Sequence, residues 1–150
     1  MSTPELVEQL TAVRAVRQAQ AAGARAKTIA RSNEASLTLA LLDDARAAAA
    51  QTADEDVARA RAGAVLDPAC LANAVRLSLR YAAAVREAER SHTDARTALA
   101  EAEASCRAAL HQVDITDDLL ADARDALRDI RGTQLDRAIE SYALLRWRAQ

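Results

Sequence analysis

The sequence predicts an all-α fold: a two-helix antiparallel, alanine-rich coiled-coil hairpin whose second helix is longer and overhangs the first. Composition, a single chain break and a heptad pattern support this prediction. Of the 150 residues, 40 are alanine, 3 are glycine and 2 are proline, and aromatic residues make up 2%. Alanine, arginine, glutamate, leucine and glutamine favour helices. β-Branched and aromatic residues are too scarce for a sheet or a multilayer core, so long helices that pack on each other are expected.

One break divides the chain into these two helices. The first helix is expected over residues 5–61, after a hydroxyl residue and a proline that favour a helix start. A glycine can end this helix, and an Asp-Pro pair can begin the next at Pro68. The expected turn is therefore 62–67 and the second helix 68–148, so that residues 1–150 form a single helical hairpin.

The second helix carries a heptad seam, in which apolar or small residues recur at alternating steps of four and three. This seam consists of Tyr81, Val85, Ala88, His92, Ala95, Leu99, Ala102, Cys106, Ala109, Val113, Thr116, Leu120, Ala123, Leu127 and Ile130. The first helix has a weaker set at the same spacing, which consists of Ala12, Val16, Ala19, Gly23, Ala26, Ala30, Asn33, Leu37 and Ala40. The two sets are expected to face each other closely because small residues dominate both. Asn33 is then expected to face His92.

The order of the charges favours antiparallel packing. With the turn centred near residue 65, residue i lies opposite residue 130 − i. A basic stretch of the first helix then faces an acidic stretch of the second, and acidic residues nearer the turn face arginines. The basic stretch is Arg14, Arg17, Arg25, Lys27 and Arg31, and it faces Glu101, Glu103, Asp114, Asp117 and Asp118. The acidic residues near the turn are Asp43, Asp44, Asp54, Glu55 and Asp56, which face Arg76, Arg80, Arg86 and Arg90. Opposite blocks in matching order select this orientation, although each exposed pair contributes little.

The same register leaves roughly 25 residues of the second helix beyond the start of the first. This overhang carries Ile130, Leu135, Ile139, Tyr142, Leu144, Leu145 and Trp147, together with Arg131, Arg137, Arg146 and Arg148. Clustered leucine, tyrosine, tryptophan and arginine are typical of protein-binding surfaces. The alternative is that the overhang docks in an oligomer or frays.

Motifs for catalysis, cofactors and metals are missing from the sequence, so we expect no enzyme, no cofactor and no metal site. There is no phosphate-binding glycine loop, dinucleotide fingerprint or HExxH pair. His92 and His111 are too far apart to share a metal, and Cys70 and Cys106 indicate reduced packing residues of a cytoplasmic protein. The charges, 20 basic against 22 acidic, indicate no nucleic-acid partner. The apolar runs are too short for membrane insertion.

The start of the second helix and the layout of the whole chain resemble a known family. Residues 71–85 present a large apolar residue, an asparagine, and then leucine, an aromatic and a small residue at characteristic spacing, and residues 134–137 give a second match. In these features the chain is similar to the FliJ/YscO-type stalk proteins of bacterial flagellar and type III secretion export apparatuses. Residues 47–50 are alanines where the flagellar pattern has aromatics, which favours the secretion-system version.

The resemblance implies a non-enzymatic central stalk that binds the export ATPase ring and couples it to the export gate. The ATPase contact would use Leu6, Leu10, Val13, Leu135, Ile139, Tyr142, Leu145 and Trp147. The gate contact would use Leu41, Leu42, Leu77, Tyr81 and Ala84. The implied partners are the type III secretion ATPase, the export gate protein and secretion chaperones, and the implied location is the cytoplasm, peripheral to the inner-membrane apparatus.

Two other functions fit the same sequence. A self-associating structural coiled coil would use the leftover apolar residues Leu79, Leu110, Ile115 and Leu119 to form a homo-oligomer. A secretion chaperone or a small secreted helical hairpin would also have this layout. A granule-coat protein fits less well, because a mean hydropathy of −0.17 and charges around both helices leave no continuous apolar face.

Overall fold

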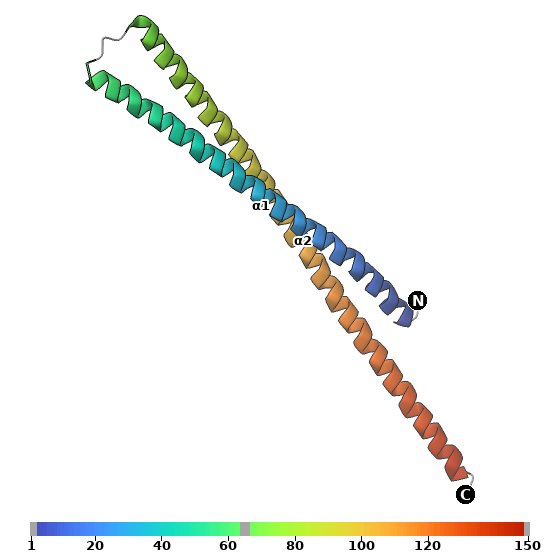
Figure 1. Cartoon of the computed structure of the whole chain (residues 1–150). Helices are drawn as coiled ribbons and strands as arrows, with labels where there is room; N and C mark the ends of the chain where they lie inside the picture. The colour runs from blue at the N-terminus through green and yellow to red at the C-terminus, as the bar shows by residue number, and fades with distance from the viewer. Residues whose placement is uncertain (1–2, 64–66, 149–150) are drawn as a thin grey trace. The chain divides into compact units, whose positions relative to one another are not determined.

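A computed structural model describes residues 3–63 and 67–148, and these form two helices, α1 (Thr3–Arg61) and α2 (Pro68–Arg148) (Figure 1). No strand occurs within the described residues. The predicted all-α hairpin with a longer second helix is thereby confirmed. α1 starts two residues before the expected position. Of the expected turn 62–67, residues 64–66 lie outside the described part of the chain.

Both helix ends beside the turn follow the local signals of the sequence. Gly63 has a φ of 65°, the left-handed conformation that glycine adopts without strain after a helix. Asp67 caps α2, since its side-chain Oδ1 accepts a hydrogen bond from the Ala69 amide at 3.3 Å. Its carbonyl accepts the first helical hydrogen bond, from the Leu71 amide at 3.0 Å.

The chain divides into two compact units, each built from a segment of α1 and a segment of α2. We call residues 25–104 the loop unit, and residues 1–24 together with 105–150 the terminal unit.

In the loop unit, cross-helix hydrogen bonds fix the antiparallel register. The Thr28 hydroxyl donates to the Ala102 carbonyl at 3.2 Å, and Thr38 Oγ1 lies 3.2 Å from His92 Nδ1. The residue numbers of each pair add up to 130, as the predicted register requires. His92 therefore contacts Thr38, and the prediction that it faces Asn33 is wrong, because Asn33 is exposed.

In the terminal unit, the residue numbers of the Arg14–Asp117 ion pair add up to 131, within one residue of the predicted register. Arg14 Nε donates to Asp117 Oδ1 at 2.5 Å. Beside this pair, Thr116 and Leu120 are 0% and 2% exposed. The core is therefore a thin line of side chains between two helices.

The face of α2 that packs on α1 is the predicted seam. Every seam residue from Tyr81 to Leu127 is buried or partly buried, and Ala95, Ala102, Leu120 and Ala123 are each less than 9% exposed. Ile130, the last expected member, is 43% exposed. The seam thus ends at Leu127.

The face of α1 that packs on α2 is opposite to the predicted one. The residues predicted to face α2 are exposed, including Val16 at 58% and Leu37 at 67%. The buried and partly buried set lies two residues earlier, which is about 200° around a helix. From residue 10 to residue 45 this set consists of Leu10, Arg14, Arg17, Ala21, Ala24, Thr28, Arg31, Ala35, Thr38, Leu42 and Ala45. The residues of this set recur at regular steps of four and three. Arginine and threonine occupy nearly half of the positions, so a search for apolar residues alone does not find this face of α1.

Only part of the predicted charge pairing occurs. Between the helices, ion pairs join Arg14 to Asp117 and Arg46 to Glu89 within the described residues, and the second pair was not predicted. Arg59 pairs with Glu55 and Asp56 of its own helix. The blocks of charge therefore agree with the orientation of the helices, while individual partners follow local geometry.

Candidate protein-interaction surface

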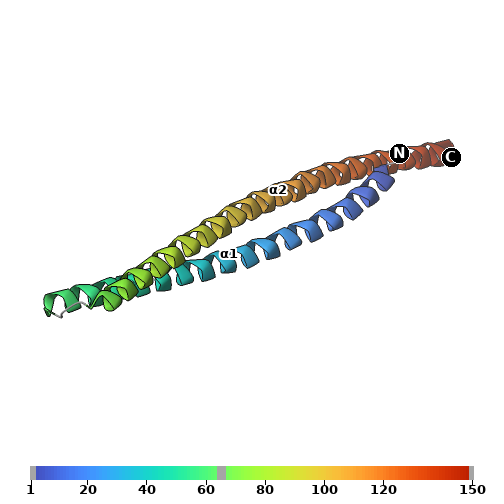
Figure 2. The ribbon, with the colours of Figure 1, turned by 90° about the horizontal axis from the view of Figure 1, so that it is seen from above.

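The last part of α2, residues 128–148, has no segment of α1 beside it, and we call it the arm. The Arg14–Asp117 pair places Thr3, the first residue of α1, opposite about residue 128. Every residue of the arm is exposed. Figure 1 and Figure 2 both show the red end of α2 continuing past the start of α1. The predicted overhang is therefore present in the terminal unit.

Large apolar side chains of the arm point into solvent. Leu135, Ile139 and Tyr142 are 62%, 58% and 69% exposed, and Trp147 is 76% exposed. Leu144 and Leu145 are exposed to a similar degree. Such a cluster at the end of a helix with no internal partner is typical of a binding surface.

The apolar residues of the arm do not continue the seam that faces α1. Continuing the steps of four and three beyond Leu127 leads to the polar residues Gln134 and Ser141. Leu135 and Tyr142 stand one residue later, which turns their stripe by about 100° around the helix. The arm therefore presents a new face rather than an unused length of the old one.

The arm also carries a positive charge. Between residues 131 and 148 there are four arginines against one aspartate and one glutamate, a net charge of +2. The arginines are Arg131, Arg137, Arg146 and Arg148. Arginine and aromatic side chains together dominate the binding energy of many interfaces. A partner with an apolar groove and an acidic rim fits this surface.

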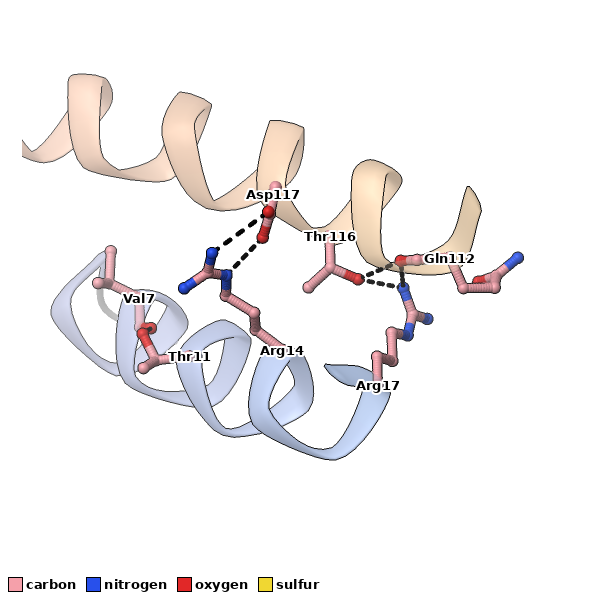
Figure 3. Close-up of polar contacts among 7 residues, drawn as sticks. All are labelled: Val7, Thr11, Arg14, Arg17, Gln112, Thr116 and Asp117. Atoms are coloured by element: carbon pink, nitrogen blue, oxygen red, sulfur yellow. Dashed lines mark hydrogen bonds and ion pairs between the residues drawn. The ribbon is translucent and has the colours of Figure 1, made fainter. Parts of the chain in front are cut away.

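A cluster of polar contacts holds α2 against α1 ahead of the arm (Figure 3). Arg14 donates two hydrogen bonds to the Asp117 carboxylate, from Nε to Oδ1 at 2.5 Å and from Nη2 to Oδ2 at 3.3 Å. Arg17 donates to the Thr116 hydroxyl and, at 3.0 Å, to the Gln112 carbonyl. The Thr116 hydroxyl in turn donates to the same carbonyl at 2.7 Å. Thr116 was a predicted member of the seam and the charges were predicted to face each other, but the hydrogen bonds that join Arg17 to Thr116 were not predicted.

Charge and hydrogen bonding in this cluster shift the pKa values of Asp117 and Arg14. The hydrogen bond from Arg14 is the largest influence on the Asp117 carboxyl and, together with the positive charges of Arg14 and Arg124, it holds the pKa of Asp117 below its ordinary value, although burial acts in the opposite direction. The same hydrogen bond and charge raise the pKa of Arg14. The pair is therefore ionised across the physiological pH range.

The N-terminal turns that were grouped with the arm lie elsewhere. Leu6 and Leu10 are partly buried and stand at the spacing of the residues that face α2, whereas Val13 is 42% exposed. By the register of Arg14 and Asp117, Leu10 lies opposite about residue 121. That position is roughly 21 Å along the helix before Leu135. The two halves of the expected ATPase contact are thus not one continuous patch.

The residues expected to contact a gate protein differ in exposure. Leu41 and Leu77 are 63% and 44% exposed, Ala84 is exposed, and Tyr81 is partly buried. Leu42 is 4% exposed, since it belongs to the α1 face that packs on α2. Its side chain is therefore not presented to a partner.

Near the turn, the loop unit has an apolar groove between its helices. The groove has a volume of about 440 Å³ and lies between Arg59 and Ala60 of α1 and Leu71, Val75 and Leu79 of α2. The three α2 residues are between 51% and 63% exposed. Their i, i+4, i+8 spacing is visible in the sequence, but the separation of the helices at this point is not.

Residues 3–63 and 67–148 contain neither a cluster of metal ligands nor a membrane-spanning helix. They contain no group of three or more histidine, cysteine or acidic residues that could hold a metal ion. Within the same residues neither helix has a stretch apolar enough to cross a bilayer. Cys70 is exposed and Cys106 is partly buried, and both are free thiols.

Comparisons of this chain with protein-family models, with curated proteins and with solved structures found no match. The family resemblance therefore rests on residues 71–85 and 134–137 and on the layout of the two helices.

Proposed function

We propose that this chain is a non-enzymatic accessory protein of a bacterial type III secretion export apparatus. In this role it is a central stalk that binds the export ATPase through the arm and links the ATPase to the export gate. The observation that carries the proposal is the exposed stripe of Leu135, Ile139 and Tyr142 on an arm that no other segment of the described residues covers. The resemblance to the FliJ/YscO-type stalk proteins supplies the identity of the partner.

The chemistry of the arm supports a protein partner. Tyr142 and Trp147 can bury large areas at small cost in conformational entropy, and the arginines beside them can pair with carboxylates. The narrow packing of the rest of the chain supports a stalk, because alanine lines much of the seam and lets two helices approach closely. Leu6 and Leu10 are partly buried at the spacing of the residues that face α2, so the proposed ATPase contact is centred on the arm.

The gate contact is proposed for the exposed residues Leu41, Leu77 and Ala84 of the loop unit. Leu42 is left out because it is buried. Location in the cytoplasm, beside the inner-membrane apparatus, and an association with secretion chaperones belong to the same proposal.

ATP hydrolysis by the type III export ATPase tests this function. The ATPase is assayed alone, with the full chain, and with a chain truncated after Ile130, which lacks the stripe. Full-length Ile139→Asp places a charge in the stripe, and Leu119→Asp is the matched control, since Leu119 is 50% exposed but lies outside the arm. Stimulation by the full chain and by Leu119→Asp, but not by the other two, is expected. Equal stimulation by Ile139→Asp would contradict the proposal.

A self-associating structural coiled coil is the second candidate. The observation that favours it is the exposed apolar face of α1 in the loop unit, where Ile29 and Leu37 are 63% and 67% exposed.

A further inference from the structure

The side of α1 that faces away from α2 carries a second apolar heptad pattern. In the loop unit it consists of Ala26, Ile29, Ala30, Asn33, Leu37 and Ala40, and we call it the outer face. All six residues are exposed. Ala35 and Leu42, which pack on α2 at 8% and 4% exposure, lie on the other side of the helix. The outer face is therefore open to a further helix without any obstruction by α2.

We propose that a second copy of this chain packs on the outer face, with the two α1 helices antiparallel and related by a two-fold axis near residues 30 to 33. This inference leaves the ATPase contact of the arm unchanged, and it gives the second candidate function, the self-associating coiled coil, a defined interface and orientation.

Side-chain sizes on the outer face are complementary in this arrangement. When Ala30 of one copy lies opposite Asn33 of the other, Leu37 lies opposite Ala26 of the other copy. Each leucine then fills the space left by an alanine, and the two-fold axis repeats the contact. A parallel arrangement would place leucine on leucine and alanine on alanine, which leaves gaps between the helices.

Charges beside the outer face also favour the antiparallel orientation of the two α1 helices. Lys27 and Glu34 are seven residues apart and so occupy the same heptad position on one edge of the face. In a parallel pair these edges lie on opposite sides of the interface, whereas in an antiparallel pair they meet. Lys27 of each copy then lies near Glu34 of the other, which gives two equivalent ion pairs. Glu34 also pairs with Arg31 of its own helix through Oε2 at 2.6 Å, and its side chain is 51% exposed.

Asn33 stands at a core position of this second interface. A single asparagine at such a position fixes register and orientation at some cost in stability. This gives the exposed asparagine within an apolar stripe a role that the α1–α2 packing does not supply, since Asn33 does not face α2.

Sedimentation equilibrium of the full chain across a concentration series tests the proposal. The wild-type chain is expected to form dimers, and Leu37→Asp is expected to be monomeric at the same concentrations. Leu79→Asp is the matched control, because Leu79 is 63% exposed in the same unit but lies on α2, and it should dimerise like the wild type. Far-ultraviolet circular dichroism checks that each variant keeps its helices.

Charge reversal tests the orientation. Lys27→Glu should raise the dimer Kd by roughly tenfold, because two attractive contacts become repulsive. Adding Glu34→Lys should restore the wild-type Kd, since the pairs reform with exchanged signs. A wild-type chain that stays monomeric, a dimer unaffected by Leu37→Asp, or a double variant weaker than Lys27→Glu would overturn the proposal. If the chain is monomeric and Leu37→Asp loses ATPase binding, the outer face belongs to that partner.

Discussion

Leu120 and Leu119 give a direct test of how α2 packs, because the two are adjacent and differ only in the direction they face. Leu120 is 2% exposed and Leu119 is 50% exposed. Replacing leucine by alanine removes three carbon groups, which is about 2.4 kcal/mol of transfer free energy for a fully buried side chain. A cavity adds to this cost, so Leu120→Ala should lower the free energy of unfolding by about 2.5 to 3.5 kcal/mol.

The same substitution at Leu119 should cost about half the transfer term, roughly 1.2 kcal/mol, because half of that side chain is already in water. Both variants gain equally in helix propensity, so this effect cancels in the comparison. Urea unfolding followed by far-ultraviolet circular dichroism measures the two losses, with the m-value as a check that the unfolded states match. Equal losses, or a larger loss at Leu119, would refute the assignment of the α1-facing side of α2.

Three further predictions follow from the described contacts. The lowered pKa of Asp117 stabilises the fold above its ordinary pKa, and this contribution is lost as the pH falls through the folded-state pKa, so Asp117→Asn should flatten the acid side of a melting-temperature profile against pH. Thr116→Val keeps the shape of the buried side chain but removes its hydroxyl, and it should cost about 1 to 2 kcal/mol in urea unfolding because Arg17 loses an acceptor. Ala35→Leu should cost about 1 to 3 kcal/mol by overpacking the interface with α2, whereas Ala50→Leu, at an exposed position of the same helix outside the outer face, should be close to neutral, and equal effects would contradict the face assigned to α1.

The sequence predicts α2 well because its seam is apolar. Leucine, valine and alanine recur there at heptad spacing, and the structure buries or partly buries these residues as far as Leu127. The position of the turn was also readable, and together with the order of charges it gives the register seen in the pairing of Thr38 with His92.

The packing face of α1 could not be found in the same way. Arg14 and Arg17 occupy facing positions, where the aliphatic part of an arginine can pack while its guanidinium reaches a partner at the edge of the interface. The prediction required apolar or small residues at the packing positions of α1. It therefore passed over these arginines and selected the opposite side of the helix. That opposite side is apolar as well, and in the loop unit it is the outer face.

The arm was predicted from the different lengths of the two helices, and its leucine, aromatic and arginine residues predicted a protein-binding surface. The length of the overhang does not show which side of α2 carries its apolar residues. Leu135 and Tyr142 are offset by one residue from the seam, so they face a different side of the helix. The family resemblance grouped Leu6 and Leu10 with the arm, although their side chains are partly buried at the α1–α2 packing positions. The distinction follows from the face of α1 that packs on α2, which the sequence prediction placed on the opposite side of the helix.

Hydrogen–deuterium exchange of the full chain, with and without the type III export ATPase, tests the central claim most directly. In the free chain, amides of the arm should exchange faster than those around Thr116 and Leu120, because no other helix covers the arm. When the ATPase is added, residues 135–147 should become protected. Protection confined to the loop unit, or no change in the arm at a concentration that saturates the ATPase, would contradict the claim that the arm is the binding surface.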